Sequence, residues 1–119
     1  MLMSVTNDES HCIVRLLEAK LDSLSAVKLK QLIKTEISSG HDNIIIDLSS
    51  VTFIDSSGVA ALIEILKSIP LQGSLSITGL NKKTQKIFKK TRIDTLLTLY
   101  PSVQDALGKV SRTIVLPDL

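Results

Sequence analysis

The strongest constraint on the fold is the continuous apolar run Ile44-Ile45-Ile46, which lies within residues 43–48. A strand with one face in solvent alternates apolar and polar residues, whereas a strand buried on both faces reads as an unbroken apolar run. Residues 43–48 are therefore predicted to form the middle strand of a sheet. Such a strand has other parts of the protein packed against both of its faces.

The composition supports one domain with an aliphatic core. The chain has 119 residues, of which 44% are hydrophobic, and this is enough for one core with little room for a second. The aromatic residues are Phe53, Phe88 and Tyr100, so Leu, Ile and Val must fill the interior. We expect a single α/β domain over residues 1–110 and a loose tail or edge segment over residues 111–119.

Apolar spacing and turn residues divide the chain into alternating strands and helices. Strands are predicted over residues 3–6, 12–18, 43–48, 74–78 and 96–100. Helices are predicted from Ser23 to near Gly40, from Ser57 to Ile69, from Lys82 to about Thr91 and from Val103 through Val110. N-cap signals precede three of them, at Asp22, Asn81 and Ser102. The second helix has few polar residues and is predicted to be largely buried. A hairpin of the first two strands followed by this order predicts a mixed sheet with helices mainly on one face.

The segment Asp55-Ser56-Ser57-Gly58 places two hydroxyls at the start of the second helix. The first turn of a helix has backbone N–H groups without intrahelical partners and lies at the positive end of the helix dipole, so an anion attached there is stabilised. A phosphoserine would fit this position. The two serines could instead be helix caps, with Gly58 allowing a close approach of the backbone.

Several segments of the chain resemble the STAS domain family. The resemblance covers about residues 3–110, and it rests on D-S-S-G at 55–58, Leu21-Asp22, the block IIIDLSSVTFIDSSG at 44–58, and residues 75–80 and 93–97. It implies a single STAS-like α/β domain with a mixed sheet. In the bacterial anti-sigma factor antagonists of this family, D-S-S/T-G marks a phosphorylated switch.

The resemblance also assigns roles to individual residues. It implies that Ser56 is phosphorylated, with Ser57 as the alternative and otherwise a helper in capping the helix. It implies that Asp22, Asp55, Ser56, Ser57 and Gly58 contact the partner. Asp22 could equally be only the cap of the first helix. Lys20 departs from the family, which often has glycine and a small or acidic residue here, so the partner surface is expected to differ.

The same resemblance implies a function and its partners. The unphosphorylated form would bind an anti-sigma factor and release the sigma factor. That anti-sigma factor would be a serine kinase with a histidine-kinase-like fold, and a metal-dependent serine phosphatase would remove the phosphate. The alternative is an adaptor subunit of a transport complex, such as a lipid-transport ATPase, or of another signalling complex, in which the serine is a contact and not a switch.

No sequence pattern indicates an enzyme or a cofactor site. The chain lacks a P-loop, a dinucleotide-binding glycine pattern and a nucleophile elbow. His11 and His41 lie far apart in sequence, with no carboxylate arranged around them in a hydrolase or zinc pattern, and we predict that they are surface residues. The single cysteine, Cys12, excludes an internal disulfide and a Cys-based metal cluster. We therefore expect no catalytic activity and no metal or cofactor.

The absence of a secretory leader and of a long apolar run predicts a cytoplasmic protein without a membrane span. A formal charge of +2 is too small to indicate a polyanion partner by itself. The third helix is different, because six cations fall between Lys82 and Arg92 with no acid among them. A solvated helix face is the favoured interpretation, ahead of an acidic protein partner and of nucleic acid or membrane. We expect no direct binding to nucleic acid.

Overall fold

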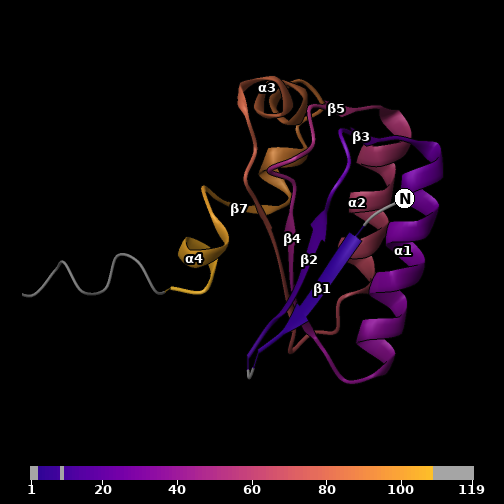
Figure 1. Cartoon of the computed structure of the whole chain (residues 1–119), viewed down its shortest axis with the longest axis vertical. Helices are drawn as coiled ribbons and strands as arrows, with labels where there is room; N and C mark the ends of the chain where they lie inside the picture. Colours follow the sequence, from indigo (N-terminus) through magenta and orange to yellow (C-terminus); the bar gives the residue numbers. More distant parts are fainter. Residues whose placement is uncertain (1–2, 9, 109–119) are drawn as a thin grey trace, which may run out of the picture.

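A computed structural model of the protein describes residues 3–8 and 10–108, and it has an α/β architecture (Figure 1). The main sheet contains β1 (Met3–Asn7), β2 (Cys12–Leu16), β4 (Asn43–Asp47), β6 (Ser74–Thr78) and β7 (Thr98–Tyr100). A separate two-stranded sheet contains β3 (Lys20–Leu21) and β5 (Phe53–Ile54). The helices are α1 (Ser23–Ser38), α2 (Ser56–Ser68), α3 (Lys82–Lys90) and α4 (Val103–Ala106), with a 3-10 turn η1 (Ile93–Thr95).

The main sheet has the order β1-β2-β4-β6-β7, so β4 lies in the middle. β1 pairs with β2 in antiparallel fashion, while β4 pairs in parallel with both β2 and β6, and β7 continues the parallel arrangement. The predictions of an N-terminal hairpin, a mixed sheet and a central strand at residues 43–48 are confirmed.

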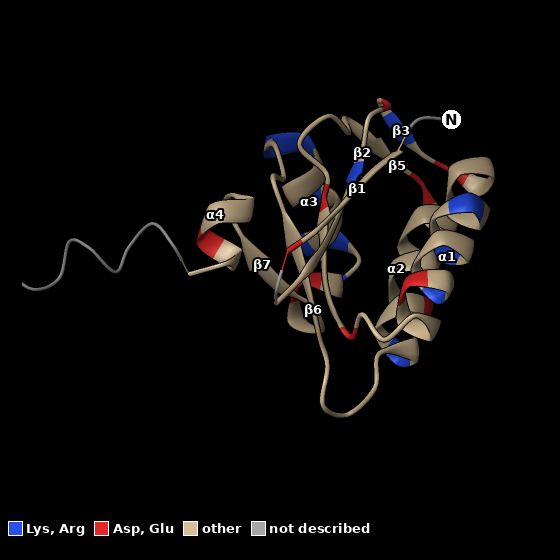
Figure 2. Cartoon of the chain, turned by 60° about the horizontal axis from the view of Figure 1, so that its bottom comes forward, with Lys and Arg blue, Asp and Glu red and all other residues tan. Residues whose placement is uncertain are grey.

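The main core lies between the sheet and the helix pair α1 and α2 (Figures 1 and 2). Ile44 and Ile46 are fully buried, and their side chains belong to one cluster with residues of both helices. The helix residues of this cluster are Leu29, Ile33, Leu62 and Ile65. Burial of an aliphatic side chain of this size stabilises a fold by about 1.5–3 kcal/mol. This core holds the N-termini of the two helices against the same edge of the sheet.

The opposite face of the sheet is covered more lightly. Ile45 points away from the α1 and α2 face because side chains alternate along a strand, yet it is also fully buried. α4 contacts β4, β6 and β7 and lies on the side of the sheet away from α1 and α2 (Figures 1 and 2). The unbroken isoleucine run therefore reflects burial on both faces, as predicted, with the longest helices on one face.

The predicted boundaries differ from the structure in four places. The last helix is shorter than predicted, because α4 ends at Ala106 and Leu107 is its C-cap. β2 ends at Leu16, because the chain turns there toward the short strand β3. α2 begins at Ser56 and is less buried than predicted, since one side packs in the core while Ala60 and Glu64 are exposed. The strand predicted over 96–100 is shorter because η1 precedes it. The expected role of Val110 and the tail over 111–119 lie outside the described residues.

Polar residues start the helices as the sequence predicts. Asp22 caps α1, Asn81 caps α3 and Ser102 caps α4. Asn81 Oδ1 accepts a hydrogen bond from the Thr84 N–H at 2.9 Å, and its Nδ2 donates to the Val51 carbonyl at 3.2 Å. Asn81 therefore both begins α3 and ties it to the loop that leads from β4 to β5.

Asp47 anchors the start of that loop from the end of β4, where its side chain is nearly buried. Thr78 Oγ1 donates to Asp47 Oδ1 at 2.9 Å, and Ser49 Oγ donates to Oδ2 at 2.8 Å. Arg15 Nε lies 3.6 Å from Oδ2. A nearly buried carboxylate is tolerated when it is paired and hydrogen-bonded in this way. The network therefore holds the first residues of the loop in place.

None of the helices in residues 3–8 and 10–108 is long and apolar enough to cross a membrane.

The packing predicts that Ile45→Ala and Leu62→Ala each lower the free energy of unfolding by about 2–5 kcal/mol, because both create a cavity in a filled core. Leu71→Ala is the matched control, since Leu71 is fully exposed, and it should change stability by less than about 0.5 kcal/mol. Urea titration measures all three values. A loss for Ile45→Ala as small as that of the control would contradict burial of β4 on both faces.

Candidate functional site

The short strands β3 and β5 bring two helix N-termini together. They pair in parallel, with Lys20 opposite Phe53 and Leu21 opposite Ile54. Asp22 and Asp55 follow these strands directly, and each is the N-cap of the next helix. The Asp55 N–H donates to the Leu21 carbonyl at 3.2 Å. The pairing thus sets the starts of α1 and α2 side by side.

Asp55 caps α2 and leaves both serine hydroxyls available. Asp55 Oδ1 accepts a hydrogen bond from the Gly58 N–H at 3.0 Å. The suggestion that the serines, and Ser57 in particular, cap this helix is therefore wrong, because the aspartate occupies the N-cap position. Ser56 is exposed and Ser57 is half-buried, and neither hydroxyl makes a hydrogen bond with another residue in the described part of the chain. Ser56 presents the more accessible hydroxyl.

Gly58 allows the close contact that positions these serines. A Cβ at this residue would lie 2.5 Å from the Leu21 carbonyl oxygen and 2.9 Å from Ile54 Cγ2. Real Cβ atoms do not approach this closely, so any side chain here would push α2 away from the paired strands. The close backbone approach expected at Gly58 is confirmed. This close approach at Gly58 is compatible with an exposed Ser56 hydroxyl, so a structural role of Gly58 does not exclude a switch at Ser56.

Asp22 caps α1 through a reciprocal capping box with Ser25. The Ser25 N–H donates to Asp22 Oδ1 at 3.2 Å, and the Asp22 N–H donates to Ser25 Oγ at 2.8 Å. Hydrogen bonds from the Ser25 N–H, and then from its hydroxyl, hold the pKa of the Asp22 carboxyl below its ordinary value of 3.8. A negative charge is therefore kept beside Ser56 at neutral pH. Sequence reasoning missed Ser25, although the spacing Asp22-x-x-Ser25 signals a capping box.

A family model described as "STAS domain" matches residues 3–106 of the chain. The chain belongs to the STAS domain family. A Thermotoga maritima relative, assigned as a candidate anti-sigma factor antagonist, is 29% identical over 77 residues, which are 64% of this chain and 68% of the relative.

Solved structures show the same fold. An anti-sigma factor antagonist from Mycobacterium paratuberculosis superposes with a TM-score of 0.82 at 24% identity and covers 92% of each chain. SpoIIAA, an anti-sigma factor antagonist, superposes in its unphosphorylated form with a TM-score of 0.69 at 18% identity, over 92% of this chain and 97% of that one. Its phosphorylated form, from Bacillus, has a TM-score of 0.68 at 19% identity, over 92% and 99%.

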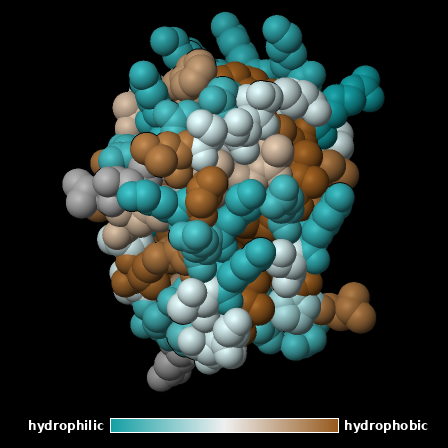
Figure 3. Space-filling model, turned by 90° about the vertical axis from the view of Figure 1, so that its right-hand side faces the viewer, coloured by the Kyte–Doolittle hydropathy of each residue, from teal (hydrophilic) through white to brown (hydrophobic). Residues whose placement is uncertain are grey.

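Exposed apolar side chains of this STAS domain lie on α1 and β5, the elements next to Asp22 and Asp55. Leu24 and Val27 on the first turns of α1 are 67% and 49% exposed, and Phe53 on β5 is 47% exposed. We call these three residues the apolar rim. Figure 3 shows apolar side chains that reach the surface between hydrophilic ones on the α1 side. Sequence reasoning missed the rim, although Leu24 and Val27 lie off the core-facing stripe of their helix.

Lys20 stands in the same neighbourhood. It is exposed and lies opposite Phe53 in the β3–β5 pair. A shallow hollow beside it is lined by Glu18, Ala19, Lys20, Asp22 and Leu24. Lys20 therefore places a positive charge at the border of the candidate site.

The structure brings all five expected contact residues together, but it leaves the histidines elsewhere. His41 Nδ1 lies 2.9 Å from Glu36 Oε1, because the chain turns back toward α1 after this helix ends. Cys12 Sγ lies 3.4 Å from the same oxygen. Burial first, and the carboxylate second, raises the pKa of the Cys12 thiol to about 12. In the described residues, no group of His, Cys, Asp and Glu has the arrangement of a metal site.

The lowered pKa of Asp22 predicts a pH-dependent contribution to stability. The charged carboxylate stabilises the fold above its unfolded-state pKa of 3.8, and this contribution is lost as the pH falls through the lower folded-state pKa. Wild type should therefore be more stable than Asp22→Asn at neutral pH, and the difference should disappear on acidification below 3.8. Urea titrations over a pH series measure it. A difference that stays constant in acid would contradict the role of the charged cap.

Proposed function

We propose that this STAS protein is a phosphorylation-controlled anti-sigma factor antagonist with Ser56 as the switch. In its unphosphorylated form it binds an anti-sigma factor, a serine kinase with a histidine-kinase-like fold, and thereby releases a sigma factor. The observation that carries the proposal is the exposed Ser56 hydroxyl, without a hydrogen-bond partner in the described residues, at the first position of a helix capped by another residue. The similarity to the Thermotoga maritima relative supports it.

The position of Ser56 lets the fold accept a phosphate. Asp55 occupies the N–H of Gly58, so the N–H groups of Ser56 and Ser57 in the first helical turn keep no intrahelical partner. A phosphate brings about −1.5 to −2 charge and three acceptor oxygens. The helix N-terminus stabilises a negative charge by about 0.3–1 kcal/mol. The likeness of this fold to both forms of SpoIIAA also supports a switch that leaves the backbone in place.

The same phosphate would disrupt the complex from the partner's side. Asp22 and Asp55 already make the surroundings of Ser56 acidic, and the apolar rim favours a partner with an apolar surface. A partner surface that fits a neutral hydroxyl and apolar side chains would have to remove water from the phosphate. Any acidic group of the partner near the phosphate would also repel it. A loss of about 3 kcal/mol lowers affinity more than a hundredfold. A metal-dependent serine phosphatase would restore binding.

Phosphorylation should occur at Ser56. Incubation of wild type with ATP and the cognate anti-sigma kinase is expected to add one phosphate, and Ser56→Ala is expected to abolish it because the hydroxyl is removed. Ser57→Ala is the matched control and should still be modified, since Ser57 is the less exposed of the two. Intact-mass and peptide mass spectrometry report the number and the site. A phosphate on Ser57, or its persistence in Ser56→Ala, would contradict the assignment.

Charge and shape at Ser56 can be separated by two substitutions. Ser56→Asp adds a negative charge with little bulk, whereas Ser56→Val adds bulk without charge. If repulsion and desolvation control binding, the Asp variant should bind the anti-sigma factor about a hundredfold more weakly than wild type. The Val variant should lose less than about tenfold in affinity. Calorimetry measures the affinities. Added salt should partly restore binding of the Asp variant, because it screens exposed charges over about 10 Å at 0.1 M.

Equal affinities for wild type, Ser56→Asp and Ser56→Val would place Ser56 outside the interface. That result would favour the adaptor function, in which the protein docks on a transport or signalling complex without a phosphorylation switch.

A further inference from the structure

A second surface of the protein has the opposite charge. Six cations lie on α3 and just after it, and we call them the α3 basic face (Figure 2): Lys82, Lys83, Lys86, Lys89, Lys90 and Arg92. All six are exposed. Within residues 3–8 and 10–108, none of them forms an ion pair with an acid. In the described part of the chain, these cations are therefore available to an anionic partner.

The charge is concentrated at this one place in the chain. The chain has 14 Lys and Arg residues and 12 Asp and Glu residues. With six cations between Lys82 and Arg92, eight are left for the rest of the chain against all twelve acids. The formal net charge of +2 is therefore the sum of a strongly basic helix and an otherwise acidic chain. Such a separation creates a local field that attracts anionic partners.

The buried side of α3 limits what that partner can be. Thr84 and Phe88 are fully buried in the core. The apolar side of this helix is therefore not available to insert into a lipid surface, as an interfacial helix does. Phe88 is also unavailable to stack on bases, and no other aromatic residue lies within α3, so the helix itself offers no ring on which single-stranded nucleic acid could stack. A protein is the favoured partner.

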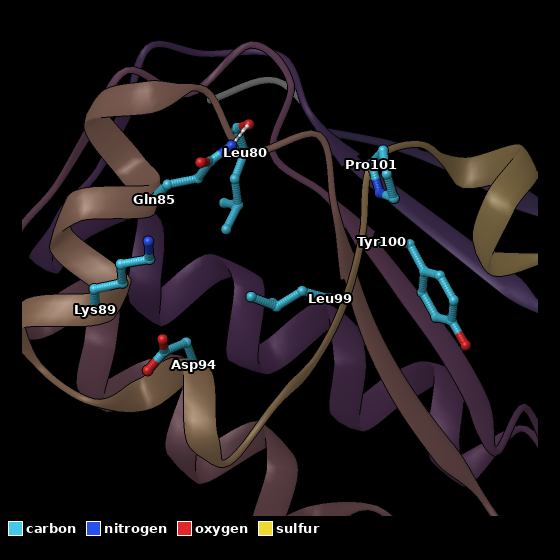
Figure 4. A pocket seen from close by; sticks show the side chains of 7 residues that line it. All are labelled: Leu80, Gln85, Lys89, Asp94, Leu99, Tyr100 and Pro101. Carbon is cyan, nitrogen blue, oxygen red and sulfur yellow. Dashed lines mark hydrogen bonds between the residues drawn. The ribbon is translucent and has the colours of Figure 1, made fainter.

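A pocket of about 380 Å³ lies beside the basic face, between α3, η1 and β7 (Figure 4). The side chains of Leu80 and Leu99 point into it, and Pro101 contributes to its lining. Gln85 forms part of the α3 side and donates from Nε2 to the Leu80 carbonyl at 3.0 Å. Lys89 belongs both to the lining and to the basic face. Asp94 and Tyr100 complete the lining, so the pocket is a largely apolar hollow with the charged side chains of Lys89 and Asp94 at its border.

We propose that the α3 basic face and this pocket together form a docking surface for an acidic polypeptide segment of a protein partner, which places one apolar side chain between Leu80 and Leu99. The cations attract the acidic residues and fix their register, while the apolar side chain supplies contact that charge alone does not give. The surface includes neither Ser56 nor the capping aspartates. Its test needs no phosphorylation, so it succeeds or fails separately from the proposed switch.

The test uses a fluorescein-labelled polyglutamate peptide with one central leucine and measures fluorescence anisotropy against the whole protein. Lys86→Gln/Lys89→Gln/Lys90→Gln should weaken binding about tenfold, since three exposed charge pairs of modest strength are lost. Lys28→Gln/Lys34→Gln/Lys67→Gln is the matched control, because these exposed lysines lie on α1 and α2 and the change in net charge is equal. The control should bind as wild type does.

A second arm tests the pocket. Replacement of the central leucine of the peptide by glutamine, or Leu99→Ala in the protein, should each weaken binding several-fold, and the two losses should not add because they remove the same contact. Equal losses in the two lysine variants would overturn the proposal, because they would show attraction to net charge alone. Phosphatidylserine vesicles or a single-stranded oligodeoxythymidine that bind at least as tightly as the peptide would also overturn it.

Discussion

Burial of β4 on both faces is the constraint from which the rest of the structure follows. Ile44 and Ile46 require cover on one face and Ile45 on the other, so β4 must lie in the middle, with β2 and β6 in parallel beside it. The carboxyl ends of parallel strands meet at one edge of a sheet. The N-termini of α1, α2 and α3 therefore gather at that edge, which makes it the natural place for a site.

At this edge, capping and switching are divided between different residues. Aspartates cap the first two helices, through Ser25 in α1 and Gly58 in α2. Because Asp55 performs the capping, Ser56 can be modified without removing the hydrogen bond that starts its helix. The close contact of Gly58 with the Leu21 carbonyl keeps α2 at a fixed distance from β3. These features together present a hydroxyl on a rigid support, which suits a switch that alters a surface and not a fold.

The protein thus has two surfaces of different chemistry on elements that start from one edge. Asp22, Asp55 and the apolar rim lie around the start of α2, whereas α3 carries a group of cations beside a largely apolar pocket. Asn81 connects the two regions, because it caps α3 and also donates to the carbonyl of Val51 in the loop before β5. A partner at the switch and a partner at α3 would contact the protein on opposite sides of the short β3–β5 pair.

Local chemistry let the sequence by itself determine the main elements, the central strand, the helix caps at Asp22, Asn81 and Ser102, and the position of Ser56 at a helix start. Periodicity and capping depend on residues only a few positions apart, so they can be read from a segment alone. Only the tertiary structure decided that Asp55 and not Ser57 caps α2, that Leu24, Val27 and Phe53 stay exposed, and that α3 and β7 enclose a pocket. It also decided the β3–β5 pairing, because two-residue strands carry no periodic signal and form only when distant parts of the chain are already packed together.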